Sequence, residues 1–356
     1  MSKTSYVPSG AKIKVIGIGG AGCNAITRMV REQIRGVEFI AMNTDAAHLE
    51  ITEAPVRISL GEKLTRGLGA GGDQNVGRRA AEESRDEIKQ ALAGADMVFL
   101  AAGMGGGTGT GAISVVAEMA KQSGALTVAT VTKPFTFEGS RRMQVAEEGI
   151  SQLITKLDTV IIVPNDKLVE LSDNKTGIDA AFKMADEVLC NAVQAIAEVI
   201  TVPGLVNLDF ADVRAIMKDA GPAWMSIGRG SGQNRTVNAA KEALAGPMLD
   251  VSIKGAKGVL FNVVGSSSLT LFEVSDAAKI IGEAVDPQAN IIFGVNIDPN
   301  MGNEVKLTLI ATGFASKDQI SGAARDREIT KVLKSLKSEE DLSVPAYMRY
   351  KGTFKR

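Results

Sequence analysis

The chain has 356 residues, enough for about two domains with complete cores. Lysine and arginine number 40 against 41 aspartates and glutamates, and 4% of residues are aromatic, which argues against a basic or base-stacking nucleic-acid surface. Two cysteines are too few for a disulfide framework, and no apolar run approaches the about 18 residues of a membrane span. These features predict a cytoplasmic protein without a nucleic-acid partner and without direct membrane insertion.

Strands and helices alternate through the first half of the chain. The predicted strands are AKIKVIGIGGAG, VEFIAMNTDA, DMVFLAAG, ALTVATVTKPF and DTVIIVPN. The predicted helices between them include NAITRMVREQI, GRRAAEESRDEIKQALAG and ISVVAEMAKQSG. Strands that are apolar throughout and separated by helices predict an α/β fold with a parallel sheet covered on both faces.

The second half begins with a long, largely buried helix over residues 177–202, a predicted spine between two domains. RTVNAAKEALAG and SDAAKIIGEAV then predict helices, and GVLFNVVG, NIIFGVNI and EVKLTLIATGF predict strands, the last two joined through DPNMGN as in a hairpin. This pattern predicts a smaller α+β domain. The expected division is an N-terminal tail (1–10), a nucleotide-binding domain (11–176), the central helix (177–203), the α+β domain (204–316), a linker (317–340) and a C-terminal tail (341–356).

The first glycine-rich segment, GIGGAGCN, lies between a predicted strand and a predicted helix. Gly17, Gly19 and Gly22 have the G-x-G-x-x-G spacing, and Asp45 ends the next predicted strand. In a dinucleotide-binding fold, such glycines let backbone N–H groups approach a pyrophosphate, and the helix N-terminus adds a favourable dipole. On this segment alone, an NAD-type oxidoreductase is the alternative function.

A second and longer segment, GMGGGTGTGA at residues 103–112, follows a later strand. A dinucleotide fold needs one phosphate loop, whereas two loops at one sheet edge suit a triphosphate. The loop glycines can form a backbone nest, and the hydroxyls of Thr108 and Thr110 can donate to phosphate oxygens. A third tract at residues 67–77 could close over the terminal phosphate, and the chain has no Walker-type G-x-x-x-x-G-K-[ST] motif. The alternative is a set of glycine-rich turns that only pack against neighbouring helices.

Seven motifs in order resemble the FtsZ family, the tubulin-like GTPases of bacterial cell division. They are GIGGAGCNA, MNTD, GEKLTRGLGAG, GGGTGTG, TKPFTFEGSRR, PNDKL and NLDFADVR, and the resemblance covers about residues 11–316 plus the tail. It implies a tubulin/FtsZ-like fold with a Rossmann-like GTPase domain. It also implies assembly-activated hydrolysis of GTP to GDP and phosphate, in head-to-tail filaments of a division ring at midcell.

The resemblance assigns nucleotide contacts to positions within these motifs. The positions in the glycine-rich loops are Gly19, Gly20, Ala21, Gly22, Cys23, Asn24, Ala70, Gly71, Gly103, Gly105, Gly106, Gly107, Thr108 and Gly109. The other positions are Asn43, Thr44, Asp45, Thr132, Pro134, Glu138, Arg142, Asn165, Phe182 and Asp186. Mg²⁺ is expected with GTP or GDP, held mainly by the phosphates because no carboxylate stands out as a metal ligand.

Two pairs among these positions are spaced i, i+4, and Phe182 and Asp186 therefore share one face of the predicted central helix. The ring of Phe182 can stack on a purine, and the carboxylate of Asp186 can accept from the N1–H and 2-amino donors of guanine, which adenine lacks. The resemblance places Asn165 at the base, and Glu138 and Arg142 at the ribose and phosphates. The simpler alternatives are a core Phe182 beside a solvated Asp186, and a surface ion pair of Glu138 with Arg142.

The phosphate loops contain only Asp73 as an acid, although hydrolysis needs a group that positions a water at the γ-phosphate. Asn207, Asp209 and Asp212 cluster just past the central helix. Asp209 and Asp212 could simply cap the helix that follows. The resemblance implies instead that this loop enters the nucleotide site of the next subunit and catalyses hydrolysis there, in a head-to-tail homopolymer.

The C-terminal LSVPAYMRYKGTFKR follows a charged linker and combines apolar with basic residues. It resembles the family's tail peptide, which binds membrane-tethering and regulatory division proteins; the alternative is an end without a role. His48 is expected to be a surface residue, and Cys23 a small residue in a tight loop. A nucleotide-gated binding module without turnover stays open as a third function.

Overall fold

The computed structural model describes residues 10–170, 177–201, 209–245, 253 and 255–313. All of these residues belong to one compact unit of the chain. The predicted linker and C-terminal tail, residues 1–9 of the predicted N-terminal tail, and Asn207 lie outside the described residues.

The described strands form a single mixed sheet. The strands of the first half are β1 (Ile13–Ile18), β2 (Val37–Asn43), β3 (Val56–Ser59), β4 (Met97–Gly103), β5 (Leu126–Lys133) and β6 (Thr159–Pro164). Those of the second half are β7 (Gly221–Ser231), β8 (Gly258–Gly265), β9 (Asn290–Ile297) and β10 (Glu304–Thr312). The order across the sheet is β3-β2-β1-β4-β5-β6-β7-β10-β8-β9.

Helices connect these strands. Those of the first half are α1 (Gly19–Arg31), α2 (Ala46–Ile51), α3 (Glu62–Thr65), α4 (Gln74–Glu83), α5 (Arg85–Leu92), α6 (Thr108–Gln122), α7 (Ser140–Ile154) and α8 (Asn165–Glu170), with the 3-10 turn η1 (Thr136–Glu138). Those of the second half are α9 (Ile178–Thr201), α10 (Phe210–Met217), α11 (Arg235–Leu244) and α12 (Leu271–Ala284), with the 3-10 turn η2 (Pro299–Met301). The predicted central helix is confirmed as α9.

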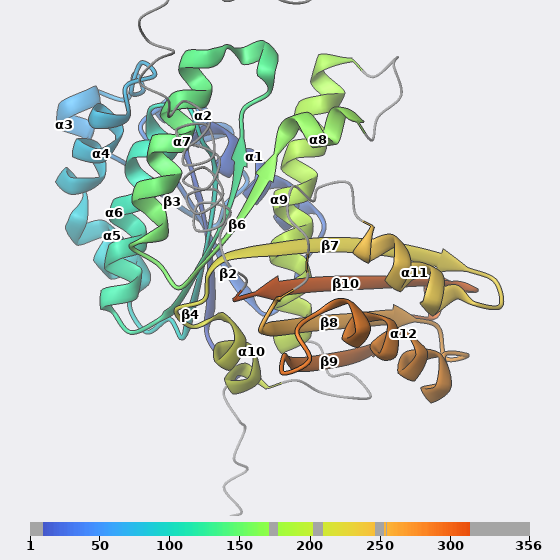
Figure 1. Cartoon of the computed structure of the whole chain (residues 1–356). Helices are drawn as coiled ribbons and strands as arrows, with labels where there is room; N and C mark the ends of the chain where they lie inside the picture. Colours follow the sequence, from blue (N-terminus) through green and yellow to red (C-terminus); the bar gives the residue numbers. More distant parts are fainter. Residues whose placement is uncertain (1–9, 171–176, 202–208, 246–252, 254, 314–356) are drawn as a thin grey trace, which may run out of the picture. The chain divides into compact units, whose positions relative to one another are not determined.

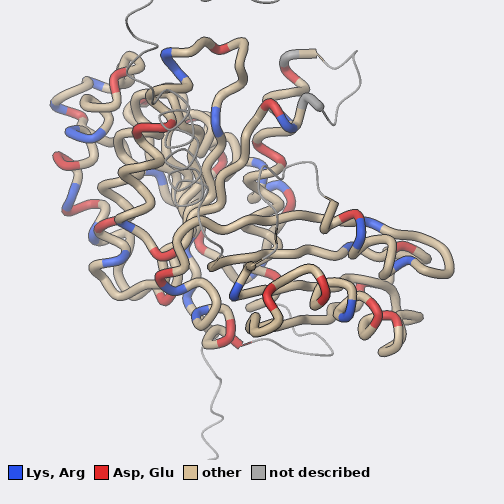
Figure 2. The backbone as a smooth tube through the Cα atoms, in the orientation of Figure 1, with Lys and Arg blue, Asp and Glu red and all other residues tan. Residues whose placement is uncertain are grey.

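The strands from β3 to β7 are parallel, as the continuous apolar runs predict. Their burial explains the sequence pattern, because every residue of β1 is buried and β4 and β5 are buried except at their last residue. In Figure 2 these central strands carry few charged residues, which lie mainly on helices and loops. The sheet does not stop between the two predicted domains, since β6 pairs directly with β7.

The predicted hairpin between β9 and β10 is wrong. β9 pairs in parallel with β8, and β10 lies between β7 and β8 and is antiparallel to both. The helical crossover through α12 places β9 on the outer side of β8, as the last strand of the sheet. The chain must then cross over β8 so that β10 can pair between β8 and β7. The link at residues 298–303, which contains η2, crosses the about 10 Å between strands two positions apart.

Two strands and one helix break were not predicted. β3 has four residues, half of them exposed, and β7 contains a proline and glycines that weaken its strand pattern. In β7, a Cβ at Gly228 would lie 1.9 Å from the carbonyl oxygen of Ala239, so glycine is needed for α11 to pack so closely. The helix predicted over residues 77–94 is divided into α4 and α5 at Ser84, whose hydroxyl accepts a hydrogen bond from the Gly61 amide.

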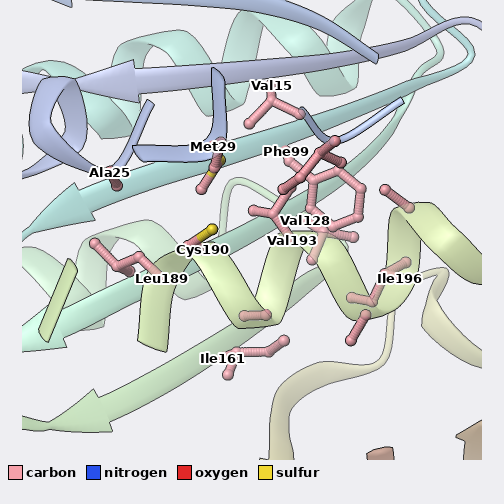
Figure 3. Packing of buried hydrophobic residues seen from close by; sticks show 14 of the residues in the cluster. Val15, Ala25, Met29, Phe99, Val128, Ile161, Leu189, Cys190, Val193 and Ile196 are labelled. Carbon is pink, nitrogen blue, oxygen red and sulfur yellow. The ribbon is translucent and has the colours of Figure 1, made fainter. Parts of the chain in front are cut away.

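The sheet is covered on both faces, and three apolar cores result (Figure 1). One face of the parallel strands packs against α1 and α9, and the opposite face packs against α4 to α7. Figure 3 shows Val193 of α9 near Phe99 and Val128 of the strands, with Leu189 farther along the helix. The third core lies between α11, α12 and the strands β8 and β10. Within the described part of the chain, no helix combines the length and apolar character needed to cross a membrane.

Both cysteines are buried in the first core, and we expect them to react slowly with thiol reagents. Burial raises the pKa of Cys23 to about 11, which corresponds to about 100-fold less thiolate than in a free cysteine near neutral pH. Burial also raises the pKa of Cys190. Labelling with a chromogenic disulfide at pH 8 should therefore be slow in the folded protein and fast in denaturant. Equally fast labelling under both conditions would contradict this packing.

Candidate nucleotide site

The glycine-rich loops follow β1 and β4, at the carboxyl edge of the parallel strands. The chain leaves β1 through α1 on one face of the sheet and leaves β4 through α6 on the other face. Adjacent strands whose connections diverge in this way form a crevice at their carboxyl ends, where α/β sheets bind ligands. The two predicted phosphate loops therefore lie at one topological switch point.

The two loops are in close contact with each other. A Cβ at Gly19, which has φ +73°, would lie 2.8 Å from the backbone nitrogen of Gly109. A Cβ at Gly103 would lie 2.8 Å from the Cβ of Ala21, and one at Gly107 would lie 2.8 Å from the Cβ of Ala70. The third glycine tract, which contains Ala70, thus packs against the second loop, and glycine is required where these backbones approach.

The helices that begin at the two loops have free N-termini. α1 starts after Ile18 and α6 after Gly107, and neither receives a side-chain capping hydrogen bond. Uncapped helix N-termini attract anions through their free N–H groups and dipole. At the start of α6, the hydroxyl of Thr108 lies 2.6 Å from that of Thr44. Thr110 is buried and accepts from the Gly105 amide at 2.8 Å, so it shapes the loop and is not among the pocket residues.

A pocket of about 220 Å³ opens at this edge. Fourteen of the predicted nucleotide positions line it: Gly20, Ala21, Gly103, Gly106, Gly107, Thr108, Gly109, Thr132, Pro134, Glu138, Arg142, Asn165, Phe182 and Asp186. Met104 and Ala185 also line it, and neither was predicted. Both lie next to predicted positions, Met104 inside the second loop and Ala185 beside Asp186, so proximity in sequence was the available signal.

The other predicted positions support the pocket from behind or beside it. Gly19, Gly105 and Ala70 belong to the packed loops, whereas Gly71 is exposed with nothing within 4 Å of where its Cβ would lie, and Gly22 and Cys23 are buried in α1. The side chain of Asn43 accepts from the Asp45 amide at 3.3 Å, and Asp45 caps α2 by accepting from the His48 amide at 3.1 Å. Asn24 lines an adjoining cavity of about 550 Å³ that shares Phe182 and Asp186 with the pocket.

An aromatic cluster lies at the end of the pocket where the nucleobase is expected, called the base end below. Phe182 contacts Phe135 edge-on, with ring centroids 5.4 Å apart, and Phe135 stacks on Phe137 at 5.0 Å. Phe182 is 42% exposed, whereas Phe135 is fully buried, so the alternative of a core Phe182 is not what the structure shows. Asn165 is buried and its Oδ1 has no hydrogen-bond partner in the structure, which suits a donor on a bound base.

Asp186 gives the base end a predicted pH dependence. Burial raises the pKa of Asp186 to about 6, and the positive charge of Arg28 acts in the opposite direction. The carboxylate accepts hydrogen bonds from guanine only when ionised, so we expect GTP affinity to fall about tenfold from pH 7 to pH 5. Titrations at both pH values with an Asp186→Asn control would separate this effect from protonation of the γ-phosphate. An equal fall in both proteins would contradict the assignment.

Glu138 and Arg142 form the ion pair weighed from the sequence, although Glu138 ends η1 and Arg142 lies in the first turn of α7. Arg142 Nη1 lies 3.0 Å from Glu138 Oε2, and Glu138 Oε1 accepts from the Phe135 amide at 2.8 Å. Asp166 holds η1 by accepting from the amide and hydroxyl of Thr136 at 2.8 and 2.6 Å. The pair thus lines the pocket and is also held by local contacts. Asp166 was not singled out from the sequence, although it belongs to the PNDKL motif.

Asp209 and Asp212 form a capping box at the start of α10. Asp209 Oδ1 accepts from the Asp212 amide at 2.9 Å, and Asp212 Oδ2 accepts from the Asp209 amide at 3.1 Å. The capping alternative is therefore realised, and it occupies one oxygen of each carboxylate. Neither residue lines the pocket.

His48 is closer to the site than the sequence indicated. Its Nε2 lies 3.0 Å from Asn24 Oδ1, and its ring is 3.5 Å from where a Cβ of Gly20 would lie. His48 is half-buried, so the expectation of a plain surface residue is incomplete. Nothing near His48 in sequence points to this contact, which depends on how α2 packs beside α1.

Residues 12–173 match the GTPase domain of the Tubulin/FtsZ family, and residues 221–315 match the C-terminal domain of the FtsZ family. FtsZ from M. jannaschii, solved as an empty dimer, is 49% identical with a TM-score of 0.82, over 85% of this chain and 88% of that chain. The chain belongs to the FtsZ family. A mutant of M. jannaschii FtsZ is also 49% identical, with a TM-score of 0.83 over 86% and 92% of the two chains.

A more distant neighbour shares the fold of this FtsZ-family chain. CetZ1 from Haloferax volcanii has a TM-score of 0.74 over 86% of this chain and 95% of that chain, with 21% identity. The match to a GTPase domain identifies the chain as a GTPase that binds GTP and GDP, as the resemblance implied. It leaves the oxidoreductase alternative without support. Among the described residues, no three His, Cys, Asp or Glu side chains gather as a metal site would require.

Proposed function

We propose that this GTPase assembles into head-to-tail filaments and that a second copy completes the hydrolytic site. In each subunit GTP occupies the pocket at the carboxyl edge of the sheet. The next subunit contributes the acid pair, Asp209 and Asp212, together with Asn207. The main support is the position of the acid pair relative to the pocket.

The acid pair and the pocket lie at opposite ends of the parallel strands, with the pocket at their carboxyl ends. β7 starts at Gly221, three residues after α10 and its cap residue, and Gly221 pairs with Thr159 at the start of β6. Asn165 of the pocket follows the end of β6. A strand of this length spans about 20 Å. In Figure 1, α10 and α8 accordingly lie at opposite ends of β6. Asp209 and Asp212 are therefore too far away to act on GTP bound in their own molecule.

The pocket residues suggest how GTP would lie. The two free helix N-termini and the glycine amides would bind the phosphates, with the Thr108 hydroxyl beside them. Phe182 would stack on guanine, while Asp186 and the unpaired Asn165 Oδ1 would accept from its N1–H and 2-amino groups. A carboxylate brought in by the next subunit would position the attacking water at the γ-phosphate.

Magnesium fits this arrangement only as a partner of the nucleotide. The acids among the pocket residues are Glu138, which is paired with Arg142, and Asp186 at the base end. The phosphate end offers the hydroxyls of Thr108 and Thr44. Phosphate oxygens would therefore hold Mg²⁺, with these hydroxyls nearby, and the ion would neutralise charge on the triphosphate.

Exposed apolar residues near the pocket support contact with another molecule. Leu68, which forms a bridge with Asp45, is 84% exposed, and Phe137 is 60% exposed beside Glu138. Large apolar side chains left in water at the rim of a polar site are typical of an interaction surface. M. jannaschii FtsZ was solved as a dimer, and we propose that self-association applies here as well.

The wider role proposed is cell division. We propose that filaments form a ring at midcell in the cytoplasm, with residues 11–176 as the GTP-binding domain and 204–316 as the domain that presents the acid pair. The tail at 341–356 would bind membrane-tethering and regulatory proteins. The test is sedimentation of the purified chain with GTP, GDP or ATP, followed by electron microscopy of the pellet. Filaments with GTP alone would support the proposal, and no pellet under any condition would contradict it.

A further inference from the structure

A charged cluster lies at the end of the parallel strands opposite the pocket, beside the C-terminal end of α6. Lys121 Nζ is 2.7 Å from Asp219 Oδ1, 3.3 Å from Asp158 Oδ1 and 3.1 Å from the carbonyl oxygen of Leu157. The side chain of Asp158 is 6% exposed, so it needs a positive partner. Lys121, Asp158 and Asp219 are called the Lys121 cluster below.

The Lys121 cluster holds the segment that joins α10 to β7. The Asp219 amide donates to Asp158 Oδ1 at 3.3 Å, and the Gly221 amide donates to the Asp158 carbonyl at 2.8 Å. Asp219 has φ +51°, a left-handed conformation that costs free energy for a non-glycine residue and so needs support from its contacts. The hydroxyl of Thr159, next to Asp158, donates to the carbonyl of Met217 at the end of α10. The C-terminal end of α10 is thus anchored to β6 and α6.

The other end of α6 belongs to the phosphate loop. α6 begins at Thr108, which lines the pocket, and its 15 residues are mostly buried between the sheet and neighbouring helices. A helix of this length is about 22 Å long and does not bend easily when it is buried. α6 therefore joins the loop that binds phosphate directly to the cluster that anchors α10.

We propose that Lys121 is a positioning residue for hydrolysis. Through Asp158 and Asp219 it fixes α10, and with it the acid pair that enters the pocket of the next subunit. This inference rests on the proposed role of Asp209 and Asp212. The alternative is a partly exposed ion pair that contributes only a little stability. The burial of Asp158 and the convergence of the cluster on the end of α10 favour a positioning role.

The chain offers a matched control for this residue. Lys156 pairs with Glu118, also on α6, at 2.7 Å, and its side chain is 36% exposed against 37% for Lys121. We expect Lys121→Met to lower kcat of the assembled protein about 3- to 10-fold, since small misplacements of catalytic groups have effects of this size or larger. KM, GTP binding to the monomer and the amount of pelleted polymer should not change. Lys156→Met should leave all four quantities unchanged, and Lys121→Arg should restore most of kcat.

Equal kcat values for Lys121→Met and Lys156→Met would overturn the inference. So would a loss of GTP binding or polymer large enough to account for the fall in rate. If Lys121→Met does not fold, Asp219→Asn removes one charge of the cluster and is expected to show the same selective fall in kcat. Asp212→Asn in the same assay distinguishes the two proposals. A normal rate in that variant refutes the role of the acid pair, whereas an inactive Asp212→Asn beside a normal Lys121→Met refutes the role of Lys121 alone.

Discussion

Replacing Asp212 by Asn is expected to lower the rate of GTP hydrolysis by at least about 100-fold, the usual contribution of a group that assists proton transfer from the attacking water. Asparagine keeps an oxygen that can accept from the Asp209 amide, the bond that Asp212 Oδ2 now makes at 3.1 Å. The charge is lost, but both hydrogen bonds of the capping box can be kept, because the other bond joins the backbone amide of residue 212 to Asp209 Oδ1. GTP binding should be unchanged, because Asp212 does not line the pocket of its own molecule. Phosphate release and nucleotide affinity, measured on the same preparation, test both parts.

A control is needed for the loss of a capping carboxylate. Asp298 caps η2 by accepting from the Asn300 amide at 2.9 Å, and it belongs to the link between β9 and β10. Asp298→Asn should therefore hydrolyse GTP at the normal rate. If both variants lose activity together, the effect of Asp212→Asn reflects folding or capping. If Asp212→Asn retains the normal rate, the catalytic assignment is wrong.

Replacing Asp186 by Asn is expected to weaken GTP binding by about 10- to 100-fold. This is the loss of affinity that corresponds to the free energy of hydrogen bonds to a charged group. Asparagine can still accept one hydrogen bond, but its NH₂ group faces the donors of guanine. The adenine ring lacks this donor pair, so weak ATP binding should change little and selectivity for GTP should fall. Equilibrium titration with both nucleotides measures the change.

The control for Asp186 lies on the same helix. Glu198, near the other end of α9, accepts from Gln194 at 2.6 Å and does not line the candidate nucleotide pocket. Glu198→Gln removes a charge from α9 and should bind GTP normally. If Asp186→Asn bound GTP with unchanged affinity, guanine would have to be recognised by other groups, such as Asn165.

The parallel half of the fold could be predicted because each of its strands is a continuous apolar run between helices. The C-terminal half could not be predicted in full. β9 and β10 are consecutive in the chain, but their pairing depends on the crossover helix α12 and on the open edge of β7. β7 itself was missed because its glycines suggest a loop until the close packing of α11 is known.

The candidate site was predicted better than the contacts that support it. The glycine-rich loops and the i, i+4 pair of Phe182 and Asp186 carry local information. Phe182, Asp186 and several loop glycines line the pocket, whereas the glycines of the G-x-G-x-x-G spacing, Gly17, Gly19 and Gly22, do not. The contact of Thr44 with Thr108, and that of His48 with Asn24, join segments far apart in sequence. Such contacts depend on how the elements pack. The motifs also could not show that the acid pair and the pocket lie at opposite ends of the parallel strands.

The most direct test of the account is the rate of GTP hydrolysis per subunit as protein concentration is raised, with ATP in parallel. If neighbouring copies complete the site, the rate per subunit should be near zero below a threshold concentration and should rise above it, with GTP only. A constant rate per subunit from the lowest concentration would mean that one molecule hydrolyses GTP unaided. That result would contradict the role proposed for Asp209 and Asp212.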